Sequence, residues 1–418
     1  MKVGISVAEA QQMVLDACPV LGCETVATVD ALGRVLAKPV VSGRTLPPAD
    51  CSAMDGYAVR AEDLAGASES NPVELSVVYE VAAGGEGGRP LRAGEAARIF
   101  TGAPIPPGAD TVVIQEDASA LGDRVKIGVA PARGENVREA GEDVRRGDLV
   151  LESGTRLGPA HLGMLASLGR SLVQVHQRPT VAILSGGDEL VDPDRDAAGG
   201  RIFASNTYSL AAQCREVGAD PINLGIARDT PEDLERLLRD GLRADFLVSS
   251  AGVSVGDRDY VRPVLEKLGC RLLFWGVLMK PGYPFAFGRF EGGRGPLVFG
   301  LPGNPVSAMV TFEQYLRPAI LKSTGHRAWF RPLVRARLTE TLRKKAGRLH
   351  FVRVQLAEKG GRIEATSTGN QSSGVLRSMA LAQGLMLFPA DATEMRAGEE
   401  VRVQLIDEQL FASTESGV

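Results

Sequence analysis

A chain of 418 residues is too long for one compact domain, so two to four domains are expected. Apolar residues make up 44% and charged residues 23%, the balance of a globular protein, and the 49 glycines and 24 prolines favour turns and short strands over a helical bundle. The formal net charge of −4 argues against nonspecific nucleic-acid binding, because that function requires a basic face.

No apolar run reaches the roughly 18 residues that a membrane span needs, and the polar sequence after Met1 is not a signal peptide. We therefore expect a cytoplasmic protein without membrane contact. The five cysteines contain no CxxC pair and no zinc-ligand spacing. They are expected to be buried free thiols in a reducing compartment: Cys18, Cys23, Cys51, Cys214 and Cys270.

The first 178 residues predict two interleaved domains. Apolar residues at helical spacing behind a Ser N-cap predict a helix from Ser6 to Cys18. Residues 49–148 consist of short segments punctuated by Gly and Pro, which predict a separate β-rich domain. Residues 149–178 include a helix at 159–168. We therefore predict that residues 1–48 and 149–178 form an N-terminal helix and connecting domain.

Strands and helices alternate in residues 179–327. Short, almost wholly apolar runs indicate strands that are buried on both faces of a sheet. Repeated β-α units of this kind predict a three-layer α/β domain with right-handed crossovers. From residue 328 the pattern becomes β-rich, so residues 328–418 are predicted to form a small C-terminal β-domain. The expected elements of the α/β domain are strands at 180–184, 222–227 and 245–249, further strands near Leu272 and Leu297, and helices at 206–217, 230–242, 260–268 and 305–322.

Polar, glycine-bearing loops follow these strands. Ligands bind outside the carboxyl ends of strands in such sheets, so we expect the loops to meet at one rim. Glycine and serine let backbone amides approach phosphate, and carboxylates beside phosphates usually hold magnesium. Taken singly, each loop reads as a turn or a helix cap, and only their coincidence indicates a ligand site. The expected ligand-binding residues of the rim are Ser185, Gly187, Ser249, Gly252, Ser254, Gly256, Lys280, Pro302, Gly303 and Asn304.

Three common enzyme classes lack their main sequence support. The chain has no Walker A lysine motif and no GxGxxG fingerprint, which disfavours an ordinary ATPase and a nicotinamide enzyme. Its four histidines have no paired spacing, which makes a zinc hydrolase a poor fit.

Residues 50–60, with the sequence DCSAMDGYAVR, resemble the signature of the molybdopterin molybdenumtransferases. This family includes the bacterial molybdenum insertases and the C-terminal domain of gephyrin. The resemblance covers nearly the whole chain in the family order. Further matching motifs are Thr101-Gly102-Ala103-Pro104, Gly141-Glu142-Asp143, Gly187-Asp188-Glu189-Leu190, Gly252-Val253-Ser254-Val255-Gly256 and Leu301-Pro302-Gly303-Asn304-Pro305-Val306-Ser307.

The resemblance implies a multidomain fold of α/β and β type. It has a three-layer α/β molybdopterin-binding domain, a β-rich second domain, an elongated connecting domain and a C-terminal β-domain. It also implies a homodimer with its active site between subunits. The implied reaction is magnesium-dependent insertion of molybdate into adenylylated molybdopterin (molybdopterin-AMP) with release of AMP, the final step of molybdenum cofactor biosynthesis. A molybdopterin adenylyltransferase and molybdoenzyme-maturation proteins are implied partners.

Matching motif positions also imply residue roles. The family's magnesium and pyrophosphate carboxylates correspond to Glu189, Asp229 and Asp259, and the residues that reach the site from the partner subunit correspond to Asp55 and Thr101. The residues on the molybdate side correspond to Ser307, Arg348 and Ser373, together with Lys280. Molybdate is a compact dianion, which suits hydroxyl groups, fixed cations and the forked donors of arginine.

Four positions depart from the family pattern. Cys51 and Ala251 are small changes, but Gly276 and Tyr283 stand where members usually carry basic residues. Losing one charge-assisted hydrogen bond costs about 1.5–3 kcal/mol, which would raise the molybdate requirement roughly a hundredfold. Tyr283→Lys is therefore expected to tighten molybdate binding. Two alternatives stay open: a paralogue specialised towards tungstate or a related step, and a noncatalytic dimeric scaffold.

Overall fold

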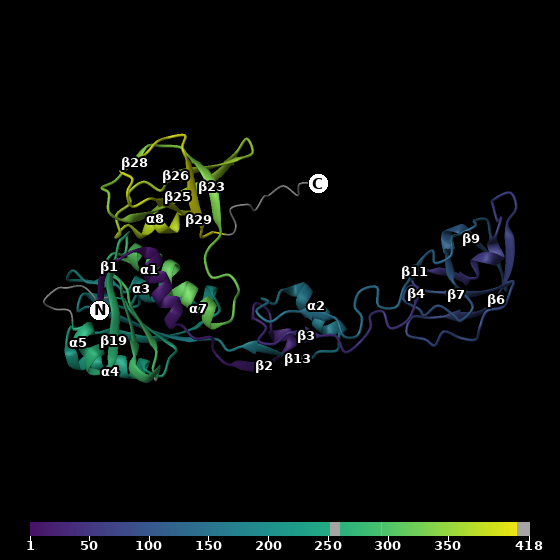
Figure 1. The fold of residues 1–418 in the computed structure, drawn as a ribbon, viewed down its shortest axis with the longest axis horizontal. Coiled ribbons are helices and arrows are strands. Elements are labelled where there is room, and N and C mark those ends of the chain that lie inside the picture. Colours follow the sequence, from purple (N-terminus) through teal and green to yellow (C-terminus); the bar gives the residue numbers. More distant parts are fainter. Residues whose placement is uncertain (251–259, 294, 408–418) are drawn as a thin grey trace. The chain divides into compact units, whose positions relative to one another are not determined.

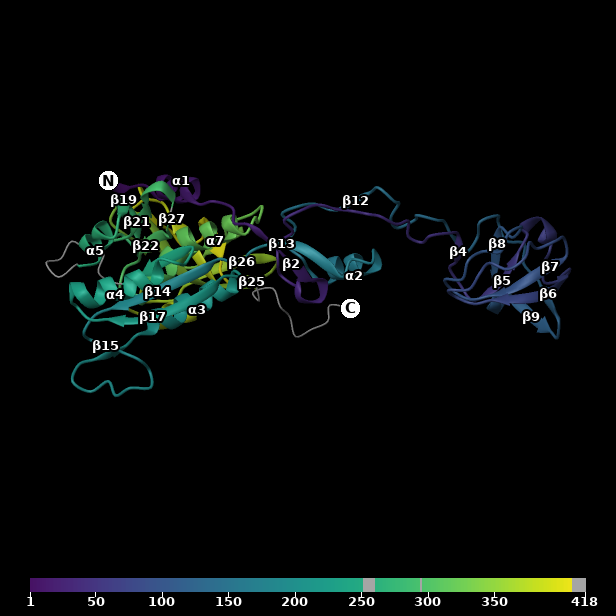
Figure 2. The same ribbon diagram turned by 90° about the horizontal axis from the view of Figure 1, so that it is seen from below.

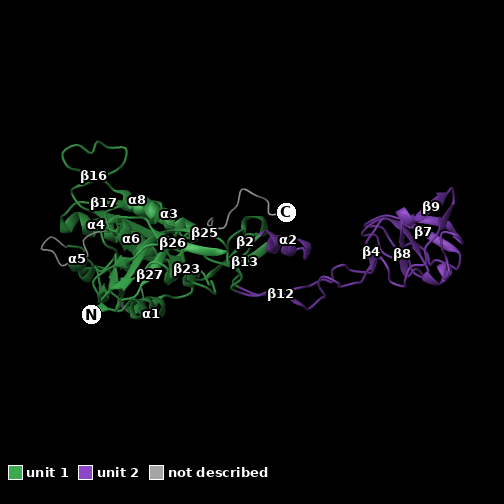
Figure 3. Ribbon diagram, turned by 90° about the horizontal axis from the view of Figure 1, so that it is seen from above, with its two compact units in different colours: residues 1–37, 154–158, 172–418 green, residues 38–153, 159–171 purple. Residues whose placement is uncertain are grey.

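The computed structural model describes residues 1–250, 260–293 and 295–407. The chain folds into two compact units, shown in green and purple in Figure 3. Unit 1 comprises residues 1–37, 154–158 and 172–418, and unit 2 comprises residues 38–153 and 159–171. The chain therefore leaves unit 1 and returns to it twice.

A seven-stranded mixed sheet forms the centre of unit 1 (Figure 1). Its strands, in spatial order, are β1 (Lys2–Ile5), β19 (Cys270–Val277), β21 (Ala286–Phe290), β22 (Leu297–Gly300), β18 (Phe246–Ser249), β14 (Thr180–Gly186) and β17 (Asp220–Ala227). The four strands from β22 to β17 run parallel, whereas β21 is antiparallel to both of its neighbours. The carboxyl ends of the four parallel strands therefore share one edge of the sheet.

Helices cover both faces of this sheet (Figures 1 and 2). Side chains of β14 alternate between two cores, with Val181 and Ile183 in one and Ala182 and Leu184 in the other, as the period of a strand requires. The three-layer α/β prediction is confirmed. The first face carries α1 (Val7–Ala17), α3 (Ser205–Glu216) and a continuous helix made of α6 (Pro305–Thr311), η5 (Phe312–Leu316) and α7 (Arg317–Ser323), and the second carries α4 (Pro231–Gly241) and α5 (Val261–Lys267).

Local sequence signals set the ends of these helices, and the predicted Ser N-cap of the first helix is confirmed. The Ser6 hydroxyl accepts a hydrogen bond from the backbone N–H of Glu9 at 3.2 Å, which caps α1. In α4, Thr230 caps the helix and Pro231 occupies its first turn. Gly218, with a φ of +82°, follows α3 and lets the chain leave the helix in a left-handed conformation.

Two strands of the sheet were not predicted. Strand β1 pairs with β19, and α1 packs against the same core, although the sequence groups residues 1–48 with the connecting segment. Strand β21 joins β19 to β22 by antiparallel pairing. The prediction of five buried thiols is wrong at one position, because Cys23 is exposed while the other four are buried.

The C-terminal part of unit 1 is a β-barrel. Strand β25 pairs with both β26 and β27, so five strands close into a ring, and β20 adds to β25 from the α/β side. The side chains of Val352, Val354 and Phe388 fill its core. The elements are β20 (Met279–Lys280), β25 (Leu349–Lys359), β26 (Arg362–Ser367), β23 (Leu333–Leu338), β29 (Glu400–Leu405), β27 (Gly384–Phe388), α8 (Leu376–Ala380) and the short pair β24 (Leu342–Arg343) and β28 (Glu394–Met395).

Unit 2 is β-rich, as the sequence predicts. Its six-stranded sheet contains β8 (Thr111–Ile114), β5 (Gly56–Val59), β7 (Glu95–Ile99), β6 (Val73–Val81), β10 (Arg124–Ile127) and β9 (Ala118–Leu121). Smaller elements of unit 2 are β3 (Val40–Val41), β4 (Cys51–Ser52), β11 (Val137–Arg138), β12 (Leu149–Leu151) and α2 (Pro159–Ser167). Among the described residues, no helix is both long and apolar enough to cross a membrane.

The remaining strands of unit 1 form two short pairs. In the connecting segment β2 (Cys23–Ala27) runs antiparallel to β13 (Leu172–His176), and beyond β14 the strand β15 (Leu190–Val191) runs parallel to β16 (Ile202–Phe203). The pairing of β2 with β13 therefore joins the chain before unit 2 to the chain after it.

Candidate active site

The carboxyl edge of the parallel strands carries a small cavity of about 200 Å³, which we call the carboxylate pocket. Glu189, after β14, and Asp229, after β17, both line it, together with Gly187 and Ser249. Both carboxylates are exposed, and neither forms an ion pair within the described residues. The pocket thus presents two free carboxylates to a ligand.

The Glu189 carboxylate lies against Gly187, in space that a side chain at position 187 would occupy. Gly187 has a φ of +139°, and a Cβ atom built on it would lie 2.5 Å from Oε2 of Glu189. Any larger residue would therefore strain the backbone and displace the carboxylate. The next loop is tied to this one, because the backbone N–H of Asp229 donates to Oδ1 of Asp188 at 3.3 Å.

The two carboxylates are a partial donor set for a divalent cation. Carboxylate oxygens are the hard ligands that magnesium prefers, and it keeps several waters when few protein ligands are present. The third predicted ligand, Asp259, lies outside the described residues, as do the loop residues Gly252, Ser254 and Gly256. Within the described residues no group of three His, Cys, Asp or Glu side chains is arranged to hold a metal ion.

Ser185 has a different place from the one expected of a ligand-binding hydroxyl. Its side chain is fully buried, and Oγ lies 2.7 Å from Oγ1 of Thr207 and 3.0 Å from Oγ of Ser250. These contacts join the ends of β14 and β18 to the start of α3. Ser185 therefore supports the rim from beneath and does not line the carboxylate pocket.

A second cavity of about 600 Å³ lies where the α/β layer meets the barrel, and we call it the anion pocket. Six of the predicted ligand residues line it: Lys280, Pro302, Asn304, Ser307, Arg348 and Ser373. The backbone N–H of Val306 donates to the carbonyl of Ser373 at 3.1 Å, which fixes the start of α6 against the barrel loop. Gly303 does not line the cavity; its carbonyl accepts from Nδ2 of Asn206 at 2.7 Å.

The wall of the anion pocket is electrostatically positive. His350, which pairs with Lys280 across β25 and β20, is buried, and its pKa is lowered to about 3. Burial is the main cause, and the charges of Lys280, Arg353 and Lys344 add to it. The imidazole is therefore neutral at pH 7. The positive charge that the pocket offers to an anion comes from Lys280 and Arg348, which line it.

Arg348 is held over an aromatic ring. Its guanidinium carbon lies 4.3 Å from the centroid of the Tyr283 ring, which itself meets the Trp275 ring edge-on at 5.7 Å. Gly276, with a φ of +78°, leaves room for this ring, because a Cβ there would lie 3.3 Å from the tyrosine Cζ and Oη atoms. The two departures from the family pattern, Gly276 and Tyr283, therefore occupy one shared space. Stacking covers the face of the guanidinium and leaves its in-plane N–H groups available.

The sequence analysis missed Arg353, which the structure places behind the barrel loop 370–373 of the anion pocket. Its side chain is fully buried, and it donates to Oγ of Ser378 at 3.1 Å and to the carbonyl of Ser372 at 3.1 Å. Burial lowers its pKa to about 10. Within the described residues it forms no ion pair, and its Nη1 has no hydrogen-bond partner. The sequence signal was a charged residue in the apolar run of β25.

Asp55 and Thr101 lie together in unit 2. Both the backbone N–H and the hydroxyl of Thr101 donate to Oδ1 of Asp55 at 2.8 Å. These two hydrogen bonds, followed by the charge of Arg98, lower the pKa of Asp55 below its usual range. The Asp55 carboxylate is therefore ionised and fixed in orientation.

Comparison with known proteins covers nearly the whole chain. Three family models match in order: the MoeA N-terminal region (domain I and II) at residues 5–169, a probable molybdopterin binding domain at residues 182–322 and the MoeA C-terminal region (domain IV) at residues 335–406. The matched ranges include all the elements that build both pockets.

Whole-chain relatives agree with these models. A molybdopterin molybdenumtransferase of Nostoc sp. is 40% identical over 89% of this chain and 86% of its own length, and molybdopterin molybdenumtransferase 2 of Mycobacterium tuberculosis is 38% identical over 95% and 98%. A crystal structure of the molybdopterin biosynthesis moeA protein from Pyrococcus horikoshii OT3 superposes with a TM-score of 0.80 at 32% identity, covering 96% of this chain and all of that one. The chain belongs to the molybdopterin molybdenumtransferase (MoeA) family.

Proposed function

We propose that this chain inserts molybdate into adenylylated molybdopterin and releases AMP. Family membership supports a transferase role in molybdenum cofactor biosynthesis. The observation that carries the specific reaction is the convergence of Lys280, Ser307, Arg348 and Ser373 on one cavity. Two cations and two hydroxyl groups around a concave site are the groups that a tetrahedral dianion requires.

On the molybdate side, the in-plane N–H groups of Arg348 and the ammonium of Lys280 bind the oxyanion, and the hydroxyl groups of Ser307 and Ser373 donate to its remaining oxygens. Arg353 holds the loop that carries Ser373. A buried cation without a counter-ion costs several kcal/mol, and an anion in the pocket would offset part of that cost. The two dithiolene sulfurs form bonds to molybdenum, and one displaced oxo ligand takes the two thiol protons and leaves as water, a step that needs orientation and no protein nucleophile.

On the phosphate side, Glu189 and Asp229 would hold a magnesium ion, with Asp259 as the predicted third ligand. When bound, such an ion neutralises phosphate oxygens while the phosphoanhydride is cleaved by water and AMP departs. The absence of a Cβ at Gly187 leaves room for the Glu189 carboxylate, and Ser249 lines the same pocket. These residues bind and orient; none of them forms a covalent bond with the substrate.

AMP release from adenylylated molybdopterin tests the proposal. Purified protein is incubated with magnesium and either molybdate, tungstate or no oxyanion, and AMP is separated by chromatography. We expect AMP with molybdate. AMP with tungstate alone would identify the specialised paralogue, and no AMP with either oxyanion would leave the noncatalytic scaffold. Arg348→Gln should lose molybdate-dependent release, whereas Arg335→Gln, an exposed barrel arginine paired with Glu400, should keep it.

The homodimer and the roles of Asp55 and Thr101 stay predictions from the family resemblance. Light scattering on the purified chain measures its mass in solution and so tests the homodimer. For the second, Asp55→Asn should lower AMP release while the unfolding temperature of the protein changes little, because the substituted side chain can still accept from Thr101.

A further inference from the structure

A cavity of about 440 Å³ in unit 1 has arginine as the most frequent residue in its wall, and we call it the arginine cavity. It lies among the connecting segment, the end of α3 and the segment that follows α7. Six arginines line it against a single carboxylate, that of Glu216. They are Arg34, Arg156, Arg178, Arg215, Arg317 and Arg331.

The arginine cavity is separate from the two pockets of the candidate active site. Helix α3 begins at the rim, where Nδ2 of Asn206 donates to the carbonyl of Gly303. It ends at Glu216, in the wall of the arginine cavity. At 1.5 Å per residue, a helix of 12 residues separates the two places by roughly 18 Å. A ligand here would not touch the reacting groups.

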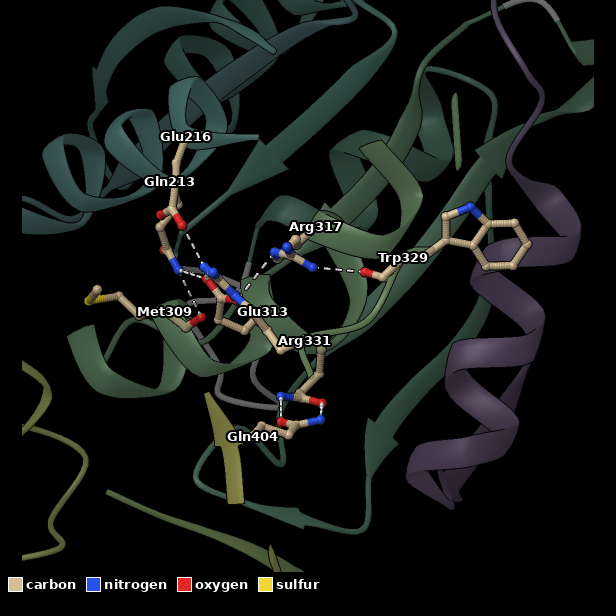
Figure 4. Close-up of polar contacts among 9 residues, drawn as sticks. Gln213, Glu216, Met309, Glu313, Arg317, Trp329, Arg331 and Gln404 are labelled. Carbon is tan, nitrogen blue, oxygen red and sulfur yellow. Dashed lines mark hydrogen bonds and ion pairs between the residues drawn. The ribbon is translucent and has the colours of Figure 1, made fainter. Parts of the chain in front are cut away.

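Four of the six arginines have acidic partners. Arg331 donates to Glu313 at 2.9 Å and to Glu216 at 2.6 Å, and Nε of Arg317 lies 3.7 Å from the same Glu313 (Figure 4). The other two pairs are Arg34 with Glu24 and Arg178 with Asp220. These pairs hold the wall together and use up the acidic charge near the cavity.

Arg156 and Arg215 are left as uncompensated cations. Both are exposed, and neither forms an ion pair within residues 1–250, 260–293 and 295–407. Two helices, α3 and α7, end near the cavity, and each C-terminus carries a partial charge of about −0.5. Together they offset roughly one of the two positive charges. The wall therefore keeps an excess of positive charge.

The neighbouring histidine responds to this charge. His326 lines the cavity, and its pKa is lowered to about 4, first by burial and then by the charge of Arg156, with Arg317 and His176 also contributing. Its Nδ1 lies 2.8 Å from the hydroxyl of Thr324. The imidazole is thus neutral at pH 7, in a place where a further positive charge is disfavoured.

We propose that the arginine cavity binds a small phosphate-bearing anion with at least two negative charges, held by the guanidinium groups of Arg156 and Arg215. Arginine forks match the paired oxygens of phosphate groups, and the volume lies in the range of ligand pockets. Inorganic phosphate and pyrophosphate both fit this chemistry. The site is proposed as a binding site and not as a second reaction centre, because its two groups without an ion pair among the described residues, Arg156 and Arg215, are cations that would hold an anion.

Isothermal titration of the full-length protein with pyrophosphate, and separately with phosphate, tests the proposal. We expect saturable binding. Arg156→Gln and Arg215→Gln should each weaken it roughly tenfold or more, which is the contribution of one charge-assisted hydrogen bond. Arg337→Gln, an exposed arginine of β23 without an ion pair among the described residues, should bind as the unaltered protein does. Circular dichroism checks that all variants are folded.

Two further titrations distinguish the arginine cavity from the anion pocket, and phosphate binding from general anion binding. Pyrophosphate can also enter the anion pocket, so the titration is repeated on the Arg348→Gln variant. Pyrophosphate should still bind to this variant, and adding Arg156→Gln to it should weaken that binding. Citrate carries comparable charge without phosphorus and should bind more weakly. Three results would overturn the proposal: no saturable binding at millimolar pyrophosphate, equal binding by Arg156→Gln and Arg215→Gln and the unaltered protein, or citrate binding as tightly as pyrophosphate.

Discussion

Replacing Tyr283 by leucine removes the ring beneath Arg348 while keeping an apolar side chain against Trp275. A cation–π contact contributes about 0.5–1 kcal/mol at an exposed site and about 2 kcal/mol when it is desolvated. Arg348 is exposed and Tyr283 is half-buried, so we take about 1 kcal/mol for this pair. On the scale of 1.4 kcal/mol per decade, Tyr283→Leu should raise the KM for molybdate roughly fivefold.

The assay is AMP release at varied molybdate and saturating adenylylated molybdopterin. Tyr283→Phe keeps the ring and should keep the KM for molybdate, which separates stacking from the hydroxyl group. Tyr283→Lys adds a charge worth about 1.5–3 kcal/mol of molybdate binding but removes the ring. Its gain in molybdate affinity should therefore be smaller than the charge alone would produce. If the leucine variant has an unchanged KM, or if the phenylalanine variant is as impaired as the leucine variant, Arg348 does not depend on the ring.

Three other changes have defined outcomes. Gly187→Ala should reduce magnesium-dependent AMP release, because the new Cβ would lie 2.5 Å from the Glu189 carboxylate, and the magnesium concentration for half-maximal rate should rise. Arg353→Gln should raise the KM for molybdate at least about tenfold in the same assay, with little loss of thermal stability, because a buried charge without a counter-ion is removed together with its hydrogen bonds. Since the pKa of His326 lies near 4 when folded and near 6.5 when unfolded, protonation favours the unfolded chain. The urea midpoint should therefore fall as the pH drops from about 6.5 to 4, and less steeply in His326→Gln.

Each of these changes has a control. Gly163→Ala, in α2, adds a Cβ that meets no atom within 4 Å and lies outside the lining of the carboxylate pocket, so an equal loss in that variant would mean that the Gly187 effect is not specific. Arg377→Gln, on the surface of α8, should leave the KM for molybdate unchanged. Parallel pH profiles for the unaltered protein and His326→Gln would show that another group causes the acid sensitivity.

Local patterns were sufficient for the α/β layer. The runs that form β14 and β18 are mostly apolar and buried, and Thr230 with Pro231 marks the start of α4. Strand β1 was missed because four residues after the start carry no periodic signal, and its partner β19 lies more than 260 residues away. Pairing at such a distance is a property of the folded chain and leaves no local trace.

In the candidate site, too, some residues could be predicted from the sequence and others depend on contacts in the folded chain. Loop chemistry after the strands led to Lys280, and the resemblance led to Glu189, Asp229 and Arg348. The structure places Glu189 with Asp229 in one pocket and Lys280 with Arg348 in the other. Their roles stay predictions. Arg353 and the stacking of Tyr283 under Arg348 were not readable, because both depend on which side chains face one another across the barrel and the sheet.

The pairing of β1 with β19 has a consequence for synthesis on the ribosome. The first strand to leave the ribosome cannot be placed until about 270 residues later, when its partner has been made. At roughly 5–20 residues per second, this interval lasts about 13–54 seconds. The core that buries Ala10 and Val14 of α1 is also incomplete during this interval, because it includes Phe274, Phe285 and the helix from α6 to α7. The N-terminal strand thus waits for its partner during most of translation, so the sheet of unit 1 is completed at this edge only late in synthesis.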